Sequence, residues 1–313
     1  MNRLKPSQLI LGVILMSCLC VSYQATLVPP FFVDSVVAIG HMEATPGPNP
    51  GLTQVRWVPD ASGFLYGDLI SKQGDQGLYE VYLVTNKHVV LDHIAAAAGP
   101  LSVRFNSQSP GSAREYDIPL NDEHGKPTWH AHADADVDLA VIRINANFLK
   151  EQGARFDFFT SNGNLLTREK AKEIGLSEGD GIFVLGFPMG LVGGIQDYVI
   201  VRQGAIARIR DRLDSPTVKT FLIDSFIFPG SSGSPVVLKP EASSIVGTKP
   251  AIHQAYLVGV VQAYVSYIDT AYSKQTKRPR VTFEENSGLA TVVPADYIQE
   301  TIEDYKKSLP PSP

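Results

Sequence analysis

Three separated stretches of this sequence carry residue types that could perform chemistry together. The stretch FPGSSGSPVV, Phe228 to Val237, holds three serines among glycines and prolines. A serine hydroxyl is a poor nucleophile until a base takes its proton, and that base needs a third group to orient it. A histidine and an acid in suitable settings elsewhere would turn this tight turn into a site of nucleophilic catalysis.

His88 has the most constrained setting of the seven histidines. In VTNKHVV it follows the end of an expected apolar strand, and β-branched residues come directly after it. Packed backbone on both sides would aim the imidazole ring, as a general base requires. The other histidines lie in polar, Pro/Gly-rich or Ala-rich stretches or at a strand edge, where a surface or structural role is the ordinary interpretation.

Asp138 is the acid with the sharpest setting. The stretch ADADVDLAVI contains three aspartates followed by a strongly apolar strand, and Asp138 directly precedes that strand. Asp134 and Asp136 lie among alanines and are expected to be solvated. A buried carboxylate facing an imidazole N–H fixes its tautomer and stabilises the imidazolium.

The order of these residues along the chain discriminates among hydrolase folds. An α/β-hydrolase runs serine, acid, histidine with the motif G-x-S-x-G, but Ser234 occupies the second glycine position here. A subtilisin order needs an acid before the histidine, and no upstream aspartate has a convincing setting; these are Asp34, Asp60, Asp68 and Asp75. The order histidine, aspartate, serine remains, which is that of chymotrypsin.

The motifs VTNKHVV, DVDLAVIRI and PGSSGSPVV together resemble the chymotrypsin-fold serine peptidases of bacterial type, including the HtrA proteases and the glutamyl endopeptidases. SGFLYG, VLGFPMG and SGLATVVPADYI extend the resemblance over roughly Val33 to Tyr305. HtrA proteases usually continue into a peptide-binding PDZ domain, and no such domain is expected here.

The resemblance implies His88 as general base, Asp138 as its orienting acid and Ser232 as nucleophile. In the family pattern G-x-S-G only Ser232 fits, because it follows Gly230 by two positions and precedes a glycine. The backbone N–H groups of Gly230 and Ser232 would form the oxyanion hole, where glycine avoids side-chain obstruction.

The resemblance also places the wall of the substrate pocket at Phe226 and Ile227 and at Gln262, Ala263 and Tyr264. These mostly apolar residues favour a small or medium uncharged substrate side chain. The expected function is a serine endopeptidase that acts through an acyl-enzyme on exposed or unfolded protein segments, with no cofactor. The alternative is a catalytically inactive module that binds peptides or partners on the same fold.

A metal site is a further alternative at His130 to Asp134, HAHAD, where alternate residues of a strand could act as ligands. No third histidine or helix motif accompanies this stretch, so no metal is expected.

The formal net charge of −5 argues against nucleic acid as a partner, because phosphate binding needs a concentrated basic surface. The short basic run from Lys274 to Arg280 is broken by Pro279 and is expected to be a solvated loop. HtrA proteases commonly trimerise, so the resemblance leaves a homo-oligomer open.

The first 25 residues have the pattern of a secretory signal, with Arg3 and Lys5 before an apolar run from Leu9 to Met16. Export to the periplasm or the extracellular space is therefore expected. LMSC, ending at Cys18, resembles a bacterial lipobox, so membrane anchoring is the alternative to cleavage. An equally good interpretation is that Cys18 and Cys20 have no chemical role and only add to the apolar character of the segment.

Many short β-branched segments separated by Gly, Pro, Asn and Asp indicate an all-β fold. With the resemblance, this predicts two antiparallel six-stranded β-barrels and a C-terminal helix. The expected organisation is a signal or anchor over 1–25, a first barrel with the histidine and aspartate over 26–150, a connection over 151–177, a second barrel with the serine over 178–293, and a helix and tail over 294–313. The connection is expected to contain a short helix over Thr167 to Ile174.

Overall fold

The structure, a computed structural model, describes residues 13–16, 27–46, 53–74, 76–243 and 251–309. Apart from Val13–Met16, the expected signal segment lies outside these ranges. The elements are β1 Val13–Met16, α1 Pro30–Asp34, β2 Val36–Pro46, β3 Thr53–Gln73, β4 Gln76–Thr85, α2 Lys87–Ala95, β5 Leu101–Asn106, β6 Ala113–Ile118, β7 Trp129–Ala131, β8 Ala140–Arg143, α3 Ala146–Glu151, β9 Phe159–Thr160, α4 Arg168–Ile174, β10 Gly181–Gly186, η2 Pro188–Gly190, β11 Ile200–Arg208, α5 Arg210–Asp214, β12 Phe221–Asp224, β13 Pro235–Leu238, β14 Ala242–Ser243, β15 Ala251–Ile252, β16 Leu257–Tyr272, β17 Pro279–Pro294 and α6 Asp296–Ser308.

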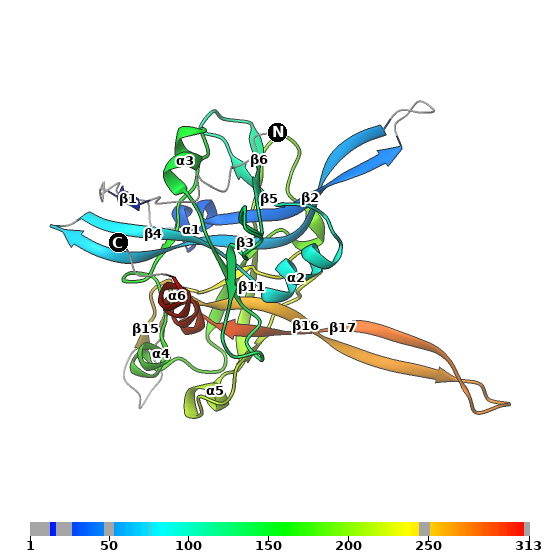
Figure 1. Ribbon diagram of the computed structural model, residues 1–313. Helices are drawn as coiled ribbons and strands as arrows, with labels where there is room; N and C mark the ends of the chain where they lie inside the picture. The colour runs from blue at the N-terminus through cyan, green and yellow to red at the C-terminus, as the bar shows by residue number, and fades with distance from the viewer. Residues whose placement is uncertain (1–12, 17–26, 47–52, 75, 244–250, 310–313) are drawn as a thin grey trace.

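The two halves of the chain form separate sheets (Figure 1). In the first, neighbouring strands run in the order β6-β5-β2-β3-β4-β8-β7, with β1 paired to β4 and β9 to β3. In the second, β10-β11-β12-β17-β16-β13 close into a six-stranded barrel. A closed barrel plus a second sheet and a C-terminal helix confirms the predicted fold class, a chymotrypsin-like arrangement.

Apolar side chains that alternate along these strands fill the interiors. One buried cluster lies inside the first sheet around Leu83 and Ile142, and another fills the second barrel around Ile206 and Ile223. A third cluster joins the halves, with Phe64 and Val84 from one side and Leu185 from the other. The third cluster fixes the two sheets against each other, so residues at their junction keep a constant separation.

Two of the observed helices follow from sequence signals. In α4, Thr167 Oγ1 accepts a hydrogen bond from the backbone N–H of Lys170, and Gly175 ends the helix at φ +73°. In α6, Ile298 and Ile302 are fully buried on one face, as their spacing predicts. The short helices α1, α2, α3 and α5 are not predicted; in α2 the β-branched valines of VTNKHVV favour a strand instead.

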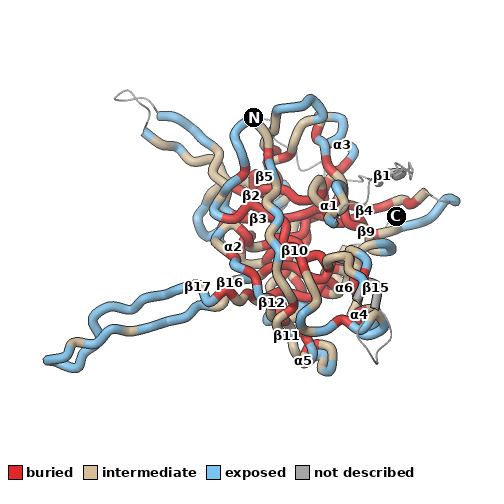
Figure 2. Tube along the Cα trace, turned by 180° about the vertical axis from the view of Figure 1, so that it is seen from behind, coloured by how far each residue is buried: buried red, intermediate tan, exposed pale blue. Residues whose placement is uncertain are grey.

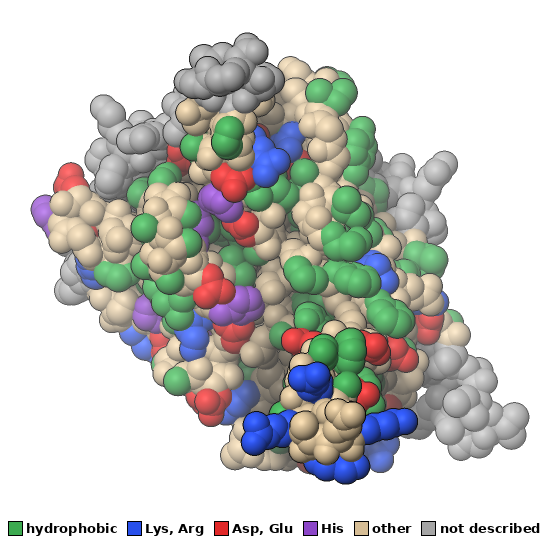
Figure 3. Space-filling model, turned by 90° about the vertical axis from the view of Figure 1, so that its right-hand side faces the viewer, with side chains coloured by type: hydrophobic (Ala, Val, Ile, Leu, Met, Phe, Trp, Pro, Cys, Tyr) green, Lys and Arg blue, Asp and Glu red, His purple; other side chains and the backbone are tan. Residues whose placement is uncertain are grey.

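Two of the hairpins that extend beyond the body of the molecule are largely exposed (Figures 1 and 2). One is formed by β2 and β3, and the other by β16 and β17, whose pairing continues from Gly259–Pro294 to Tyr272–Pro279. The basic run is the tip of the second hairpin, where Lys and Arg side chains gather (Figure 3). Within the described ranges, no helix is long and apolar enough to cross a membrane.

Candidate active site

The residues predicted for catalysis come from three elements at the junction of the two sheets. His88 lies in α2, Asp138 in the segment before β8, and Ser232 in the loop between β12 and β13. His88 and Ser232 line one cavity of about 520 Å³, to which His41 and Asp92 also contribute. Histidine and acidic side chains gather on this face of the molecule (Figure 3). The fold therefore brings residues 144 positions apart to one hollow (232 − 88).

Asp138 holds the imidazole of His88. Its Oδ2 lies 2.6 Å from His88 Nδ1, and the Asp138 side chain is only 13% exposed whereas that of His88 is 40% exposed. A carboxylate at this position accepts a hydrogen bond from Nδ1–H, so the proton of the neutral ring stays on Nδ1 and Nε2 is the unprotonated nitrogen. The half-exposed ring thus has one nitrogen fixed and the other free for proton transfer.

The same carboxylate also caps helix α2. Asn86 occupies the N-cap position but its side chain makes no capping bond there; instead its Nδ2 donates to the backbone oxygen of Asp138 at 2.9 Å. Asp138 Oδ1 accepts the backbone N–H of His88 at 2.9 Å. A negative charge at a helix N-terminus satisfies an otherwise unpaired N–H and is favoured by the helix dipole. The Asp138 carboxylate therefore both stabilises the start of α2 and orients the imidazole of His88.

The pKa values of this pair shift in opposite directions. The hydrogen bond to Asp138 raises the pKa of His88 above 6.5, although burial acts against this. Burial alone would raise the pKa of Asp138, but the hydrogen bonds and charge of His88 outweigh it and bring the pKa below 3.8. The charges of an imidazolium and a carboxylate thus stabilise each other, as a base that gains a proton during reaction requires.

Only one of the three serines in the loop reaches solvent. Ser231 is 2% exposed and Ser234 is fully buried, whereas Ser232 is half-buried and lines the cavity with His88. Burial makes Ser231 and Ser234 unable to reach a substrate. Geometry therefore selects the same serine that the G-x-S-G pattern selects.

Backbone hydrogen bonds hold nearly every polar group of the serine loop. The carbonyl oxygens of the five consecutive residues from Phe228 to Ser232 all accept hydrogen bonds. In chain order, their donors are Ser231 N, Met189 N, Ser62 Oγ, Ser234 N and Ser62 N. Gly233 N donates to Val261 O at 3.0 Å. Across the described part of the chain, the N–H groups of Phe228, Gly230 and Ser232 have no such acceptor. The donors of Gly230 and Ser232 are the ones predicted for the oxyanion hole.

Glycine is required at two positions of this loop. Gly230 has φ +91°, and a Cβ there would lie 2.6 Å from Phe187 O. Gly233 has φ +83°, and its Cβ would lie 2.1 Å from Ser62 O. Any other residue would combine an unfavourable backbone conformation with a backbone clash. The glycines thus allow the tight turn in which the N–H groups of Gly230 and Ser232 have no backbone acceptor.

The residues predicted to bind substrate lie around Ser232 in different environments. Ser232 Oγ is 3.4 Å from the backbone oxygen of Gln262, Ala263 is exposed and Tyr264 is partly exposed. Phe226 is 53% exposed, whereas Ile227 is 2% exposed and packs in the interior of the second barrel. Their part in substrate binding stays a prediction.

The HAHAD stretch has structural contacts. His132 Nδ1 accepts the backbone N–H of Asp134 at 3.0 Å, and its ring packs against Tyr297. His130 packs against Tyr305. Asp134, expected to be solvated, forms a 2.8 Å ion pair with Lys219. No group of three or more His, Cys, Asp or Glu side chains is arranged to hold a metal ion in the residues that the structure covers.

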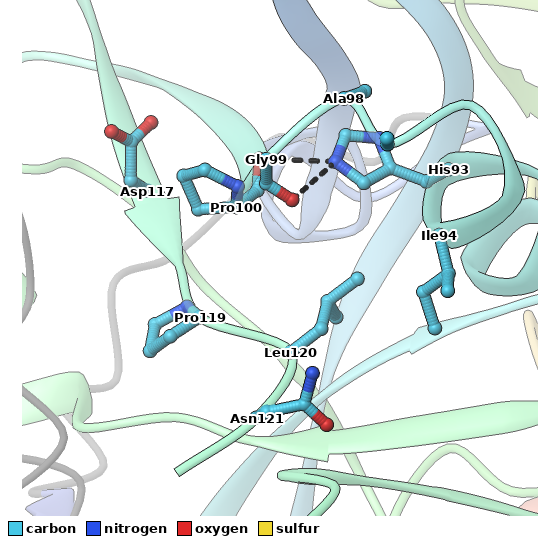
Figure 4. A pocket seen from close by; sticks show the side chains of 10 residues that line it. His93, Ile94, Ala98, Gly99, Pro100, Asp117, Pro119, Leu120 and Asn121 are labelled. Carbon is cyan, nitrogen blue, oxygen red and sulfur yellow. Dashed lines mark hydrogen bonds between the residues drawn. The ribbon is translucent and has the colours of Figure 1, made fainter. Parts of the chain in front are cut away.

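A second cavity of about 520 Å³ lies at the C-terminal end of α2 and shares His93 and Ala98 with the first (Figure 4). It is lined by His93, Asp117 and Leu120, among others, and includes none of His88, Asp138 and Ser232. His93 Nε2 lies 3.1 Å from both Gly99 O and Pro100 O, so this nitrogen is engaged in closing the turn after α2. We assign this cavity no part in the chemistry of the site.

Comparison with known proteins agrees with this geometry. The sequence model of the trypsin-like peptidase domain matches residues 61–247, which is more than half of the chain. The chain belongs to the trypsin-like peptidase family. No curated protein matches it significantly. The family match covers His88, Asp138 and Ser232, and membership identifies the protein as a serine peptidase at the level of the family.

Proposed function

We propose that this trypsin-like peptidase is a serine endopeptidase in which Ser232 is the nucleophile, His88 the general base and Asp138 the acid that orients His88. One observation carries the proposal: the only solvent-accessible serine of the loop shares a cavity with a histidine whose other ring nitrogen is held by a carboxylate. A base fixed in this way can activate a hydroxyl that is otherwise inert.

Acylation begins when the Ser232 hydroxyl turns from Gln262 O towards His88 Nε2, by rotation about its Cα–Cβ bond. Nε2 takes the hydroxyl proton while Oγ attacks the substrate carbonyl carbon, and Asp138 stabilises the imidazolium. The N–H groups of Gly230 and Ser232 donate to the resulting oxyanion. His88 then protonates the leaving amine, and an ester to Ser232 remains.

Deacylation repeats these steps with water. His88 Nε2 takes a proton from water, the hydroxide attacks the ester carbonyl, and Ser232 Oγ leaves with the proton returned by His88. The same two N–H groups stabilise the second tetrahedral intermediate. The products are an acid, an amine and the free enzyme.

An extended peptide is the substrate shape that the site favours. The pairing of β16 with β13 ends at Val260–Pro235, and Gly233 N reaches Val261 O. In the described chain, the edge of β16 beyond Val261 has no strand partner on the Ser232 side. A free edge can pair with an extended segment of another chain, so we propose exposed or unfolded protein segments as substrates.

A fluorophosphonate probe tests the nucleophile. We expect the wild type and the matched controls Ser231→Ala and Ser234→Ala to be labelled, and Ser232→Ala to be unlabelled. Casein cleavage should be present in the wild type and fall by up to about 10⁶-fold in Ser232→Ala. Equal labelling of the wild type and Ser232→Ala would refute the assignment. An unlabelled wild type that still bound peptides would favour the inactive module instead.

A further inference from the structure

Ser62, in β3, makes three hydrogen bonds that cross from the first sheet to the second. Its hydroxyl donates to Gly230 O at 2.8 Å and accepts the backbone N–H of Phe187 at 3.0 Å. Its backbone N–H donates to Ser232 O at 2.9 Å. The residue is fully buried, so water does not compete for these bonds.

The two loop carbonyls that Ser62 holds belong to Gly230 and Ser232, the two residues whose N–H groups are proposed for the oxyanion hole. Gly230 is in a conformation that only glycine adopts easily, and glycine has the least intrinsic resistance to rotation of its neighbouring peptide planes. A hydrogen bond on Gly230 O restrains rotation of the peptide that joins Gly230 to Ser231. The bond on Ser232 O restrains the peptide that follows the nucleophile.

Ser62 is also connected to the strand that precedes the base. Thr85 Oγ1 donates to Ser62 O at 3.0 Å, and Thr85 lies three positions before His88 at the end of β4. The absence of a side chain at Gly233 lets the loop approach both groups closely, because a Cβ there would be 2.1 Å from Ser62 O and 2.4 Å from Thr85 Oγ1. One residue therefore contacts both the serine loop and the strand leading to His88.

We propose that Ser62 is a positioning residue, whose hydroxyl fixes the peptide between Gly230 and Ser231. This peptide lies between the two peptides that carry the oxyanion-hole N–H groups, so fixing it keeps the hole aligned with His88. This inference rests on the proposed role of Ser232 as nucleophile. Ser62 touches no reacting atom; it acts through Gly230. A merely structural role would satisfy the buried Phe187 N–H and stabilise the fold without affecting the transition state.

The test compares Ser62→Ala with Ser102→Ala in the full chain. Ser102 is 1% exposed and its hydroxyl has no hydrogen-bond partner among the described residues, so it controls for loss of a buried serine. For Ser62→Ala we expect kcat/KM on a peptide amide to fall about 10- to 100-fold with KM nearly unchanged. Affinity for a peptide boronate, which mimics the tetrahedral state, should fall in parallel, while affinity for a product peptide stays constant.

Two further measurements separate positioning from stability. Thermal unfolding shows whether each variant is folded at the assay temperature, and Ser62→Cys, nearly isosteric with a weaker donor, should give an intermediate kcat/KM. If Ser62→Ala does not fold, Ser62→Cys carries the same comparison. The pH at which kcat/KM is half-maximal should be unchanged, because the defect lies in the loop rather than in His88.

Several results would overturn the inference. These are a kcat/KM within twofold of the Ser102→Ala control, or a loss of boronate and product-peptide affinity by the same factor. A shifted pH dependence would do the same, since it would indicate an effect through His88. If the wild type is labelled at Ser232 and active while Ser62→Ala is equally active, only this inference fails. If the wild type is neither labelled nor active, the proposed function fails first.

Discussion

Asp138 binds His88 through both of its carboxylate oxygens, one on the imidazole Nδ1 at 2.6 Å and one on the backbone N–H at 2.9 Å. The first bond orients the ring, and the second satisfies an N–H at the start of α2. Because both bonds are made by one planar carboxylate, Asp138 cannot turn away from the ring without also losing its bond at the helix start. A single side chain thus couples the local fold to the chemistry proposed for it.

Replacing Asp138 by asparagine should separate these two roles. An amide is neutral and can present its NH₂ to Nδ1, which favours the wrong tautomer, so we expect kcat/KM to fall about 10³- to 10⁴-fold. Loss of the charge at the helix start should cost about 1 kcal/mol in the free energy of unfolding. Steady-state kinetics and urea unfolding measure the two effects. Asp136→Asn, an exposed neighbour, is the matched control, and an equal loss in both variants would contradict the role of Asp138.

The pH dependence of activity should report the raised pKa of His88. The base works only when neutral, so kcat/KM should rise with pH and reach half its maximum above pH 6.5. In Asp138→Asn the principal cause of the shift is gone, so the half-maximum should move to lower pH. An activated ester substrate keeps the slow variant measurable. A half-maximum at the same pH in both proteins would contradict the assignment of the base.

The stability contributed by this pair should change in the opposite sense. Since the folded-state pKa of His88 is raised, its stabilising effect is complete below pH 6.5 and is lost as the pH rises through the folded-state value. The difference in unfolding free energy between the wild type and His88→Gln should therefore shrink from pH 6 to pH 8, where activity increases. Chemical denaturation at several pH values checks this. A difference that grows with pH would contradict the sign.

Much of the fold could be predicted from local patterns. The boundaries of β10 and β13 match the predicted segments, because Gly and Pro punctuate short β-branched runs there. The long hairpin of β16 and β17 could not be predicted beyond its buried base. Its outer residues lack a buried face, so exposed residues such as Tyr267, Ile268 and Phe283 give no consistent alternation.

The predicted site residues lie together at the junction of the sheets, but their supporting contacts are not visible in the sequence. Ser62 and Asn86 act through hydrogen bonds to residues that are 168 and 52 positions away. Such contacts depend on how the two sheets pack, which no local spacing encodes. Similarly, α2 forms where β-branched residues favour a strand, since Asp138 caps it from a distant segment.

Removing the long hairpin should leave the barrel and its chemistry intact. Tyr267 to Glu285 lie outside the three buried clusters, and their ends are joined by the paired residues Ser266 and Asn286. A two-residue Asn-Gly turn between that pair should change the unfolding free energy little and leave kcat/KM on a short peptide within about twofold. Circular dichroism, urea unfolding and peptide hydrolysis test this. A large loss of activity with an intact fold would instead assign the hairpin to the active site.

The pair formed by Arg212 and Asp296 should matter most to the attachment of α6. Arg212 Nη2 lies 2.8 Å from Asp296 Oδ2, their side chains are only 5% and 17% exposed, and the guanidinium lies over the Tyr297 ring. Arg212→Met would leave Asp296 buried without its partner, so we expect a loss of about 3–5 kcal/mol in urea unfolding at neutral pH. Because burial already raises the pKa of Asp296, that variant should regain stability as the pH falls and the carboxyl is protonated. Arg210 lies in α5, as Arg212 does, but its ion pair with Glu178 is exposed. Arg210→Met should therefore lower the free energy of unfolding far less than Arg212→Met. Equal losses of unfolding free energy in Arg212→Met and Arg210→Met would show that the buried pair does not anchor α6. The same would follow if Arg212→Met regained no stability at low pH.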